Sequence, residues 1–140
     1  MNWIRKTLSI LPIFVGIGAL AGGYACLADI YNPIGAPLSL LEHSPFTSYF
    51  LPGLFLFIVI GLGNLVCAVM VWRFSIVGML SSLALGLALS AWIVIQCWIL
   101  QATAALHIMF LMVGLLQTAL ALWQLIKSGD LVYLLRELVN

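Results

Sequence analysis

Two histidines, His43 and His107, are the side chains in this sequence best suited to hold a metal ion or a haem. His43 lies in a polar connection beside Glu42, and His107 lies near the start of an apolar segment. A metal site built on them would need a third ligand at helical spacing, and the sequence offers none. We therefore interpret both histidines as side chains at a membrane surface, and we predict no metal ion and no cofactor.

The three cysteines, Cys26, Cys67 and Cys97, form no Cys-x-x-Cys pair and lack the histidine companions of a zinc site. A thiol redox enzyme would need a reactive pair, and no two of these cysteines are close in the sequence. A disulfide between Cys26 and Cys97 stays open, because the segments that carry them bring both toward the same side of a membrane.

Acidic and basic side chains are missing from the central part of every apolar segment. Inside membranes such residues mark proton relays and ion-coupled transporters. A small multidrug antiporter has a similar size and four helices but depends on a glutamate inside its first span, so the sequence argues against that function. Catalytic carboxylates cannot be paired either, because Asp29 and Glu42 belong to one solvated connection. We predict a protein that is not an enzyme.

The composition places most of this chain in lipid. Of its 140 residues, 65% are hydrophobic and only 6% are charged, whereas a soluble domain carries about a quarter charged residues. A water-soluble fold of this size could not hide so much apolar surface. The net charge of +1 provides no basic field for a phosphate backbone, so we exclude nucleic acid and expect the lipid bilayer as the main partner.

Four apolar segments are long enough to cross a bilayer, which takes about 20 residues. They are too long and too uniformly apolar for the strands of a barrel, so they must be helices whose backbone groups are satisfied internally. We predict an all-α integral membrane protein, a four-helix transmembrane bundle forming one membrane domain over residues 1–140. The spans are predicted at 8–28, 49–72, 75–99 and 104–126.

The basic residues predict the orientation. All five fall on one side of the four spans: Arg5, Lys6, Arg73, Lys127 and Arg136. The connections on the other side contain no lysine or arginine, so the positive-inside rule places both termini in the cytoplasm. A secretory signal with a cleavage site near Ala21 is the alternative for the N-terminus, but the apolar run continues to Ala28, which favours a retained span.

Two segments outside the spans have predicted structure. The outer loop, residues 29–48, has turn signals at Asn32-Pro33 and Gly35 and is expected to fold back on the membrane surface. The tail, residues 129–140, alternates leucines and valines with polar residues at helical spacing, with Asp130 as its expected N-cap. We predict a short helix that lies in the cytoplasmic interface.

Small residues are expected to bring the helices together, because association in lipid depends on close packing and interhelical hydrogen bonds. Two spans carry them at a spacing of four: Gly18 and Gly22 in the first, and Gly78, Ser82, Gly86 and Ser90 in the third. We interpret these faces as packing within the chain, with a homodimer as the alternative.

Asn64 of the second span and Gln117 of the fourth lie at a similar depth near the middle of the bilayer, counting about 1.5 Å per residue. We predict that both face the bundle interior and lie near each other. An amide pair that fixes the register of two helices is the structural interpretation, and a polar contact for a buried ligand is the functional one.

A pattern in the first half of the chain resembles a known group. It consists of Gly22-Gly23-Tyr24, Asn32-Pro33-Ile34-Gly35, Leu40-Leu41-Glu42-His43-Ser44-Pro45-Phe46 and Leu51-Pro52-Gly53. This resembles uncharacterised small bacterial membrane proteins of four helices, in which an Asp-Pro-x-Gly turn precedes Leu-Glu-x-Ser-Pro-Phe and a Pro-Gly that opens the second span. Asn32 replaces that aspartate here, and His43 stands where a small residue is frequent. The resemblance implies the fold and a bacterial origin, and no activity.

The leading functional hypothesis is a non-enzymatic protein of the bacterial inner membrane that acts through contacts, as an accessory subunit of another membrane protein. The alternative is a binder or carrier of a small apolar molecule, a lipid or a quinone, in a pocket beneath the outer loop. The residues expected to line that pocket are Trp92, Gln96, Gln101, His107 and His43.

Overall fold

The computed structural model describes residues 3–73, 75–101 and 103–140. Within these ranges the chain is all-helical, and four helices are long and apolar enough to cross a membrane. They are α1 (Trp3–Ala28), the continuous helix Phe50–Arg73, α4 (Ser75–Leu100) and α5 (Ala105–Ser128). Four helices therefore lie at the positions of the predicted spans, although α1 begins at Trp3 instead of residue 8. Its basic first turn joins the bundle because Arg5 Nε donates a 2.9 Å hydrogen bond to the Val71 carbonyl.

The second span changes its winding part-way. It begins as α2 (Phe50–Phe55), continues as the π-helical segment η3 (Leu56–Leu62) and ends as α3 (Gly63–Arg73). A π-helical turn shifts the backbone hydrogen bonds and often marks a functional position. Here the Asn64 side chain compensates, since its Nδ2 donates to the Ile60 carbonyl at 2.7 Å. No pattern in the sequence predicted this segment.

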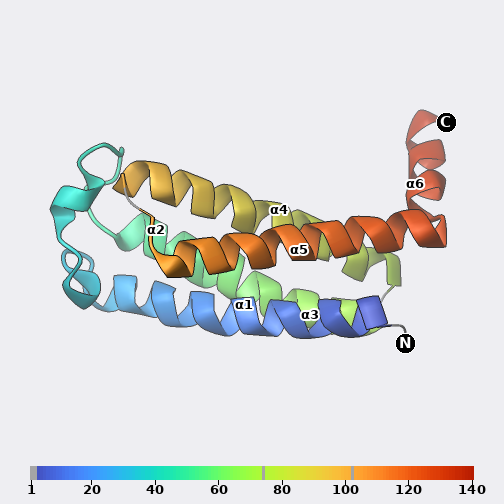
Figure 1. The fold of residues 1–140 in the computed structure, drawn as a ribbon, viewed down its shortest axis with the longest axis horizontal. Helices are drawn as coiled ribbons and strands as arrows, with labels where there is room; N and C mark the ends of the chain where they lie inside the picture. Colours follow the sequence, from blue (N-terminus) through green and yellow to red (C-terminus); the bar gives the residue numbers. More distant parts are fainter. Residues whose placement is uncertain (1–2, 74, 102) are drawn as a thin grey trace.

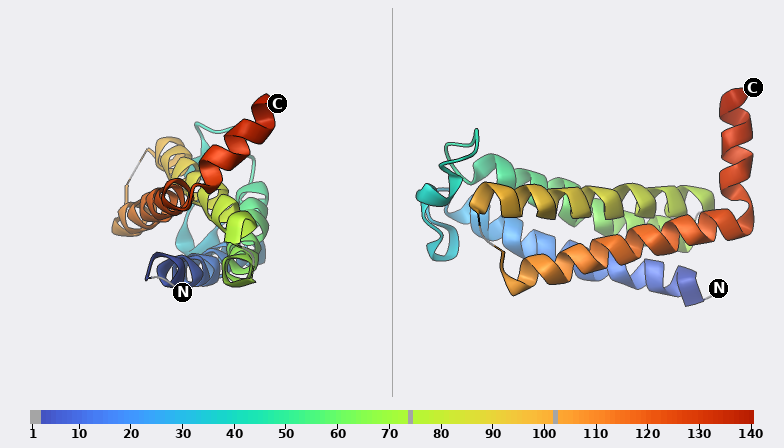
Figure 2. Two further views of the ribbon diagram at one scale, coloured as in Figure 1. Left: turned by 90° about the vertical axis from the view of Figure 1, so that its right-hand side faces the viewer. Right: turned by 45° about the horizontal axis from the view of Figure 1, so that its top comes forward.

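The four spans run antiparallel and close into a ring (Figures 1 and 2). Helices that follow each other in the chain lie side by side, with the most extensive contact between α1 and the second span, followed by that between α4 and α5. The ring closes where α5 meets α1, and this seam is the least extensive of the four. Both termini lie at one end, here called the basic end, and the connection between α1 and α2 lies at the other, the loop end.

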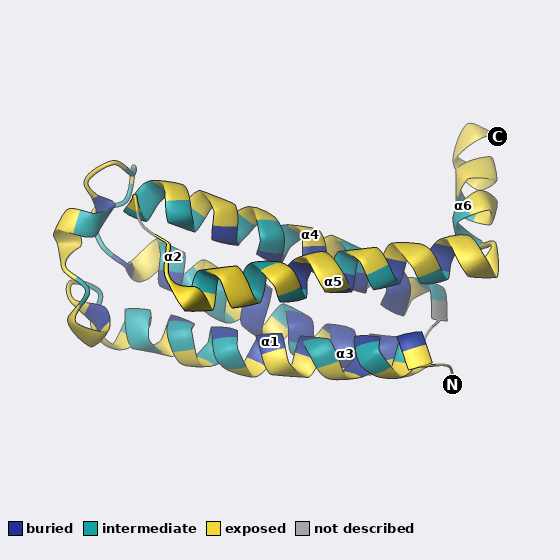
Figure 3. Cartoon of the chain, in the orientation of Figure 1, coloured by how far each residue is buried: buried dark blue, intermediate teal, exposed yellow. Residues whose placement is uncertain are grey.

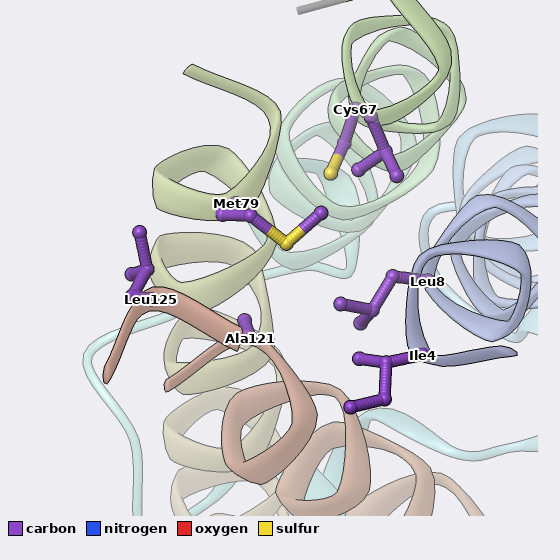
Figure 4. Packing of buried hydrophobic residues seen from close by; sticks show 7 residues of the cluster. Ile4, Leu8, Cys67, Met79, Ala121 and Leu125 are labelled. Carbon is purple, nitrogen blue, oxygen red and sulfur yellow. The ribbon is translucent and has the colours of Figure 1, made fainter. Parts of the chain in front are cut away.

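Two clusters of buried side chains fill the bundle. The cluster near the basic end joins all four spans and is shown in Figure 4. It consists of Ile4, Leu8, Cys67, Val71, Met79, Ala121 and Leu125. The second cluster lies nearer the loop end: Val15, Ala19, Ile60, Leu89 and Ile93. Burial is confined to the inward faces (Figure 3), so the outward faces present apolar side chains, as lipid contact requires.

The loop at the loop end is folded. It contains two short 3₁₀ turns, η1 (Pro33–Gly35) and η2 (Leu38–Leu41), which pack on α1 and α4 respectively. Asp29 begins it, because its Oδ1 accepts hydrogen bonds from the backbone N–H groups of Tyr31 and Asn32. Tyr49 ends it: its N–H donates to the Ile30 carbonyl at 2.7 Å.

The tail forms α6 (Asp130–Val139), a helix with no buried residue that turns sharply away from α5 (Figure 1). Gly129 permits the turn with a φ of 82°, in the left-handed region that glycine tolerates. The expected N-cap was wrong. Gly129 occupies that position, and Asp130 is the first helical residue, where its carboxylate accepts a hydrogen bond from the Ser128 hydroxyl at 2.8 Å.

Candidate functional site

The small residues of α4 pack against neighbours within the chain. A Cβ added at Gly78 would meet the Val71 Cα at 2.5 Å, and one added at Gly86 would meet Thr118 Oγ1 at 2.5 Å. Ser82 is fully buried and shares a 3.2 Å hydrogen bond with Cys67. Gly78 and Ser82 therefore allow α4 to pack closely on α3, and Gly86 allows it to pack closely on α5.

Ser90 of α4 and the glycines Gly18 and Gly22 of α1 also pack against neighbouring helices. Ser90 Oγ donates to the Gly86 carbonyl at 2.8 Å and lies close to Gly114 of α5. In α1, a Cβ at Gly18 would meet the Phe110 ring at 2.8 Å, and one at Gly22 would meet Leu56 at 3.2 Å. Both small-residue faces are thus covered by helices of the same chain.

The amide pair lies at the centre of the bundle, as predicted. Asn64 and Gln117 are both 0% exposed, and Gln117 Nε2 donates to Asn64 Oδ1 at 3.3 Å. The bond crosses the ring between α3 and α5. Gln117 Oε1 is buried without a hydrogen-bond partner among the described residues. The pair does not line the cavities described below, so its geometry fits the structural interpretation.

A cavity of about 210 Å³ lies beneath the loop, and we call it the loop cavity. One water needs roughly 10–15 Å³ on the same measure, so the space suits a larger guest. Its roof comes from the loop, including Ile34, Leu41 and Phe46. Its walls come from the ends of three spans and include Cys26, Tyr49, Pro52, Trp92 and Gln96.

A second cavity of about 220 Å³ lies deeper, and we call it the bundle cavity. Side chains of all four spans line it: Val15, Gly18 and Ala19 from α1, Leu56 and Ile60 from the second span, Leu89, Ile93 and Gln96 from α4, and Leu106, His107 and Phe110 from α5. Gly22, Leu56 and Gln96 line both cavities, so the two spaces adjoin each other. No Asp, Glu, Lys or Arg is among the described residues that line either one.

The structure brings together three of the five residues expected in the pocket. Trp92 lines the loop cavity, His107 lines the bundle cavity, and Gln96 lines both. Gln101 and His43 line neither and are exposed. Gln101 follows the end of α4 with a left-handed φ of 55°, and its amide donates to the Trp98 carbonyl instead of facing inward.

Polar groups around the cavities differ in their partners. His107 Nδ1 accepts a 3.0 Å hydrogen bond from the Ala104 N–H at the start of α5. Gln96 is half-buried and makes no side-chain hydrogen bond to another described residue. Trp92 Nε1 is buried without a partner among the described residues, and its ring lies 4.7 Å from that of Phe55. Such unpaired buried groups are rare in native proteins.

Tyr49 holds the roof in place and was missed as a site residue. It is 7% exposed, and its hydroxyl donates to the Pro37 carbonyl at 2.9 Å. The sequence suggested only an aromatic residue at the membrane interface, because nothing in the pattern reveals which carbonyl a tyrosine will reach.

The roof also contains a strained residue. Ile34 has a φ of 49°, which is unusual for a β-branched side chain, and it is 89% exposed. Strain of this kind costs about 1–3 kcal/mol and gathers at binding sites. Ile34 lines the loop cavity, so its strained backbone is consistent with a loop conformation that serves binding at a cost in stability.

Reactive chemistry has little support in this geometry. Cys26, Cys67 and Cys97 are free, so the open disulfide between Cys26 and Cys97 is not formed in this structure. Among the residues that the structure describes, no three His, Cys, Asp or Glu side chains lie close enough to hold a metal ion. Comparisons with protein-family models, with curated proteins and with solved structures find no match.

Proposed function

We propose that this chain is a multi-pass protein of the bacterial inner membrane that binds a small apolar molecule without transforming it. The observation that carries the proposal is the pair of adjoining cavities, apolar except for a few hydrogen-bonding groups and roofed by a folded loop. Binding sites for small molecules have this composition. The four apolar spans support the membrane location.

The orientation in this proposal follows from charge. The basic residues gather at the basic end, so the positive-inside rule places both termini in the cytoplasm and the loop on the outer side. The tail helix α6 would then lie in the cytoplasmic interface, with the exposed side chains of Leu135, Leu138 and Val139 toward the acyl chains.

An accessory role, the leading hypothesis from the sequence, is the second candidate. The observation that favours it is α6, because this amphipathic helix has no buried residue and, although Leu131 packs on the bundle, leaves Leu135, Leu138 and Val139 exposed. A partner membrane protein could cover these side chains. This candidate makes no use of the cavities.

Native mass spectrometry of the chain, extracted from its own membrane in mild detergent, separates the two candidates. We expect a retained small molecule in the wild-type protein. The adduct should be lost in Gly22→Leu, because Gly22 lines both cavities and the added side chain would fill them. Ala21→Leu is the matched control, since Ala21 is exposed on the same turn of α1. A stoichiometric protein companion without an adduct would support the accessory role instead.

A further inference from the structure

The polar groups of the bundle cavity lie at one end of it. Gln96 and His107 occupy the end nearer the loop, and the deeper wall is formed by apolar residues such as Val15, Ile60 and Leu89. Gln96 is four residues before the end of α4 and His107 is in the first turn of α5, so both lie about 6 Å or less inside the helix ends. The cavity therefore has the polarity of an amphiphile aligned with the surrounding lipid.

The groups at the polar end are mainly donors. His107 Nδ1 accepts the Ala104 N–H, so a neutral imidazole must carry its proton on Nε2, which can only donate. The Gln96 amide adds two donor hydrogens beside one acceptor oxygen and has no partner among the described side chains. Trp92 does not contribute here, because its N–H is covered by neighbouring atoms.

Charge restricts the guest further. No Asp, Glu, Lys or Arg is among the described residues lining either cavity, so an ionised headgroup would lose its hydration without gaining a counter-charge. An uncharged carbonyl needs only hydrogen-bond donors. At the α1–α5 seam, Phe110 lines the cavity, lies over Gly18 and stacks on Phe14 at 5.8 Å between ring centroids.

We propose that the ligand is an uncharged amphiphile whose polar end carries carbonyl oxygens that accept hydrogen bonds from Gln96 and His107, with its apolar chain between α1 and α5. This rests on the proposed function and names the chemical class that the cavity recognises. Quinones and acyl esters share this chemistry. The carbonyl end lies under the loop and the chain extends toward Ile60.

Thermal unfolding of the purified full-length chain in detergent can test the class with four probes of equal chain length. The probes are a decyl-substituted benzoquinone, a decyl ester, decane and the decanoate anion. We expect the quinone, the ester or both to raise the unfolding midpoint, with decane and decanoate binding about tenfold more weakly because each lacks a matched head. Binding of the quinone alone would identify a quinone headgroup, and equal binding of the ester would identify the carbonyl as the determinant.

Gln96, near the end of α4, provides the test variant, and Gln101, just after that end, provides its control. Gln96→Leu should reduce binding of the carbonyl probes to that of decane, and it breaks no side-chain hydrogen bond of the fold. Gln101→Leu should leave binding unchanged, because Gln101 is exposed outside both cavities.

Different results would contradict the carbonyl class of the ligand and the binding function itself. Equal binding of decane and the carbonyl probes, or unchanged binding in Gln96→Leu, would overturn the carbonyl class while the apolar binding function stood. If no probe binds, decane included, and the Gly22→Leu variant retains every native adduct of the wild type, the binding function itself is wrong.

Discussion

At the scale of single residues, the two central amides have unequal roles. Asn64 is used twice, because its Nδ2 satisfies the Ile60 carbonyl of the π-helical segment and its Oδ1 accepts from Gln117. Gln117 makes one hydrogen bond and leaves its Oε1 buried and unpaired among the described residues. Removing Asn64 therefore loses two hydrogen bonds, although the Ile60 carbonyl still accepts from the Gly63 N–H, whereas removing Gln117 loses one and eliminates an acceptor that was already unpaired.

This asymmetry predicts different costs for two nearly isosteric replacements. Asn64→Leu should lower the free energy of unfolding by about 1–2 kcal/mol, near the upper end for polar contacts in membrane bundles. Gln117→Met should change it by less than about 0.5 kcal/mol, because an unpaired buried acceptor is removed together with the hydrogen bond. Unfolding in mixed micelles titrated with a denaturing detergent measures both. Equal costs would show that the pair acts as one symmetrical contact.

At the scale of helices, glycines determine how closely α4 approaches its neighbours. Backbone atoms of Thr118 and Gly114 lie 2.9 and 3.0 Å from the position of a Cβ at Gly86, and backbone cannot move aside as a side chain can. Gly63 differs, since the nearest atom to its added Cβ is the tip of Leu85 at 3.3 Å. The two sites differ in what an extra methyl group would displace.

Alanine at these two glycines should therefore have opposite effects. Gly86→Ala should destabilise the bundle by about 1–3 kcal/mol through overpacking between α4 and α5. Gly63→Ala should be neutral or stabilising by up to about 1 kcal/mol, because Leu85 can rotate and alanine favours the helix. Helix content during detergent-induced unfolding gives both values. A stable Gly86→Ala variant would mean that α4 and α5 can separate at little cost.

Sequence predicted the helices well because each span is encoded by a long apolar run, and counting residues along two such runs was enough to pair Asn64 with Gln117. Depth does not determine direction, however. Gln101 has the expected depth but follows the end of α4, where a left-handed residue turns it outward. The π-helical segment escaped prediction because a change of winding inside a uniformly apolar run leaves no signal in the residue pattern. Tyr49 escaped because its partner carbonyl belongs to a loop whose path no periodicity describes.

At the scale of the whole molecule, the bundle is a lipid-facing shell with unequal ends. Only 17% to 33% of the residues in the four span windows are buried inside the chain, so most side chains of the spans are left for lipid. The loop end carries the folded roof, and the basic end carries both termini and α6. We expect the roof to lie on the outer side of the membrane, because the loop contains no lysine or arginine, and the orientation determines which leaflet the proposed ligand enters from.

Single-cysteine labelling in intact cells can determine this orientation. The background is Cys26→Ala, Cys67→Ala and Cys97→Ala, to which either Ser39→Cys in the loop or Asn140→Cys at the end of α6 is added; both positions are exposed. Because the loop contains no lysine or arginine, a membrane-impermeant maleimide should label Ser39→Cys in intact cells and Asn140→Cys only after permeabilisation. Labelling both variants after permeabilisation controls for reactivity. The reverse pattern would place the roof in the cytoplasm, and a ligand bound beneath it would then come from the inner leaflet.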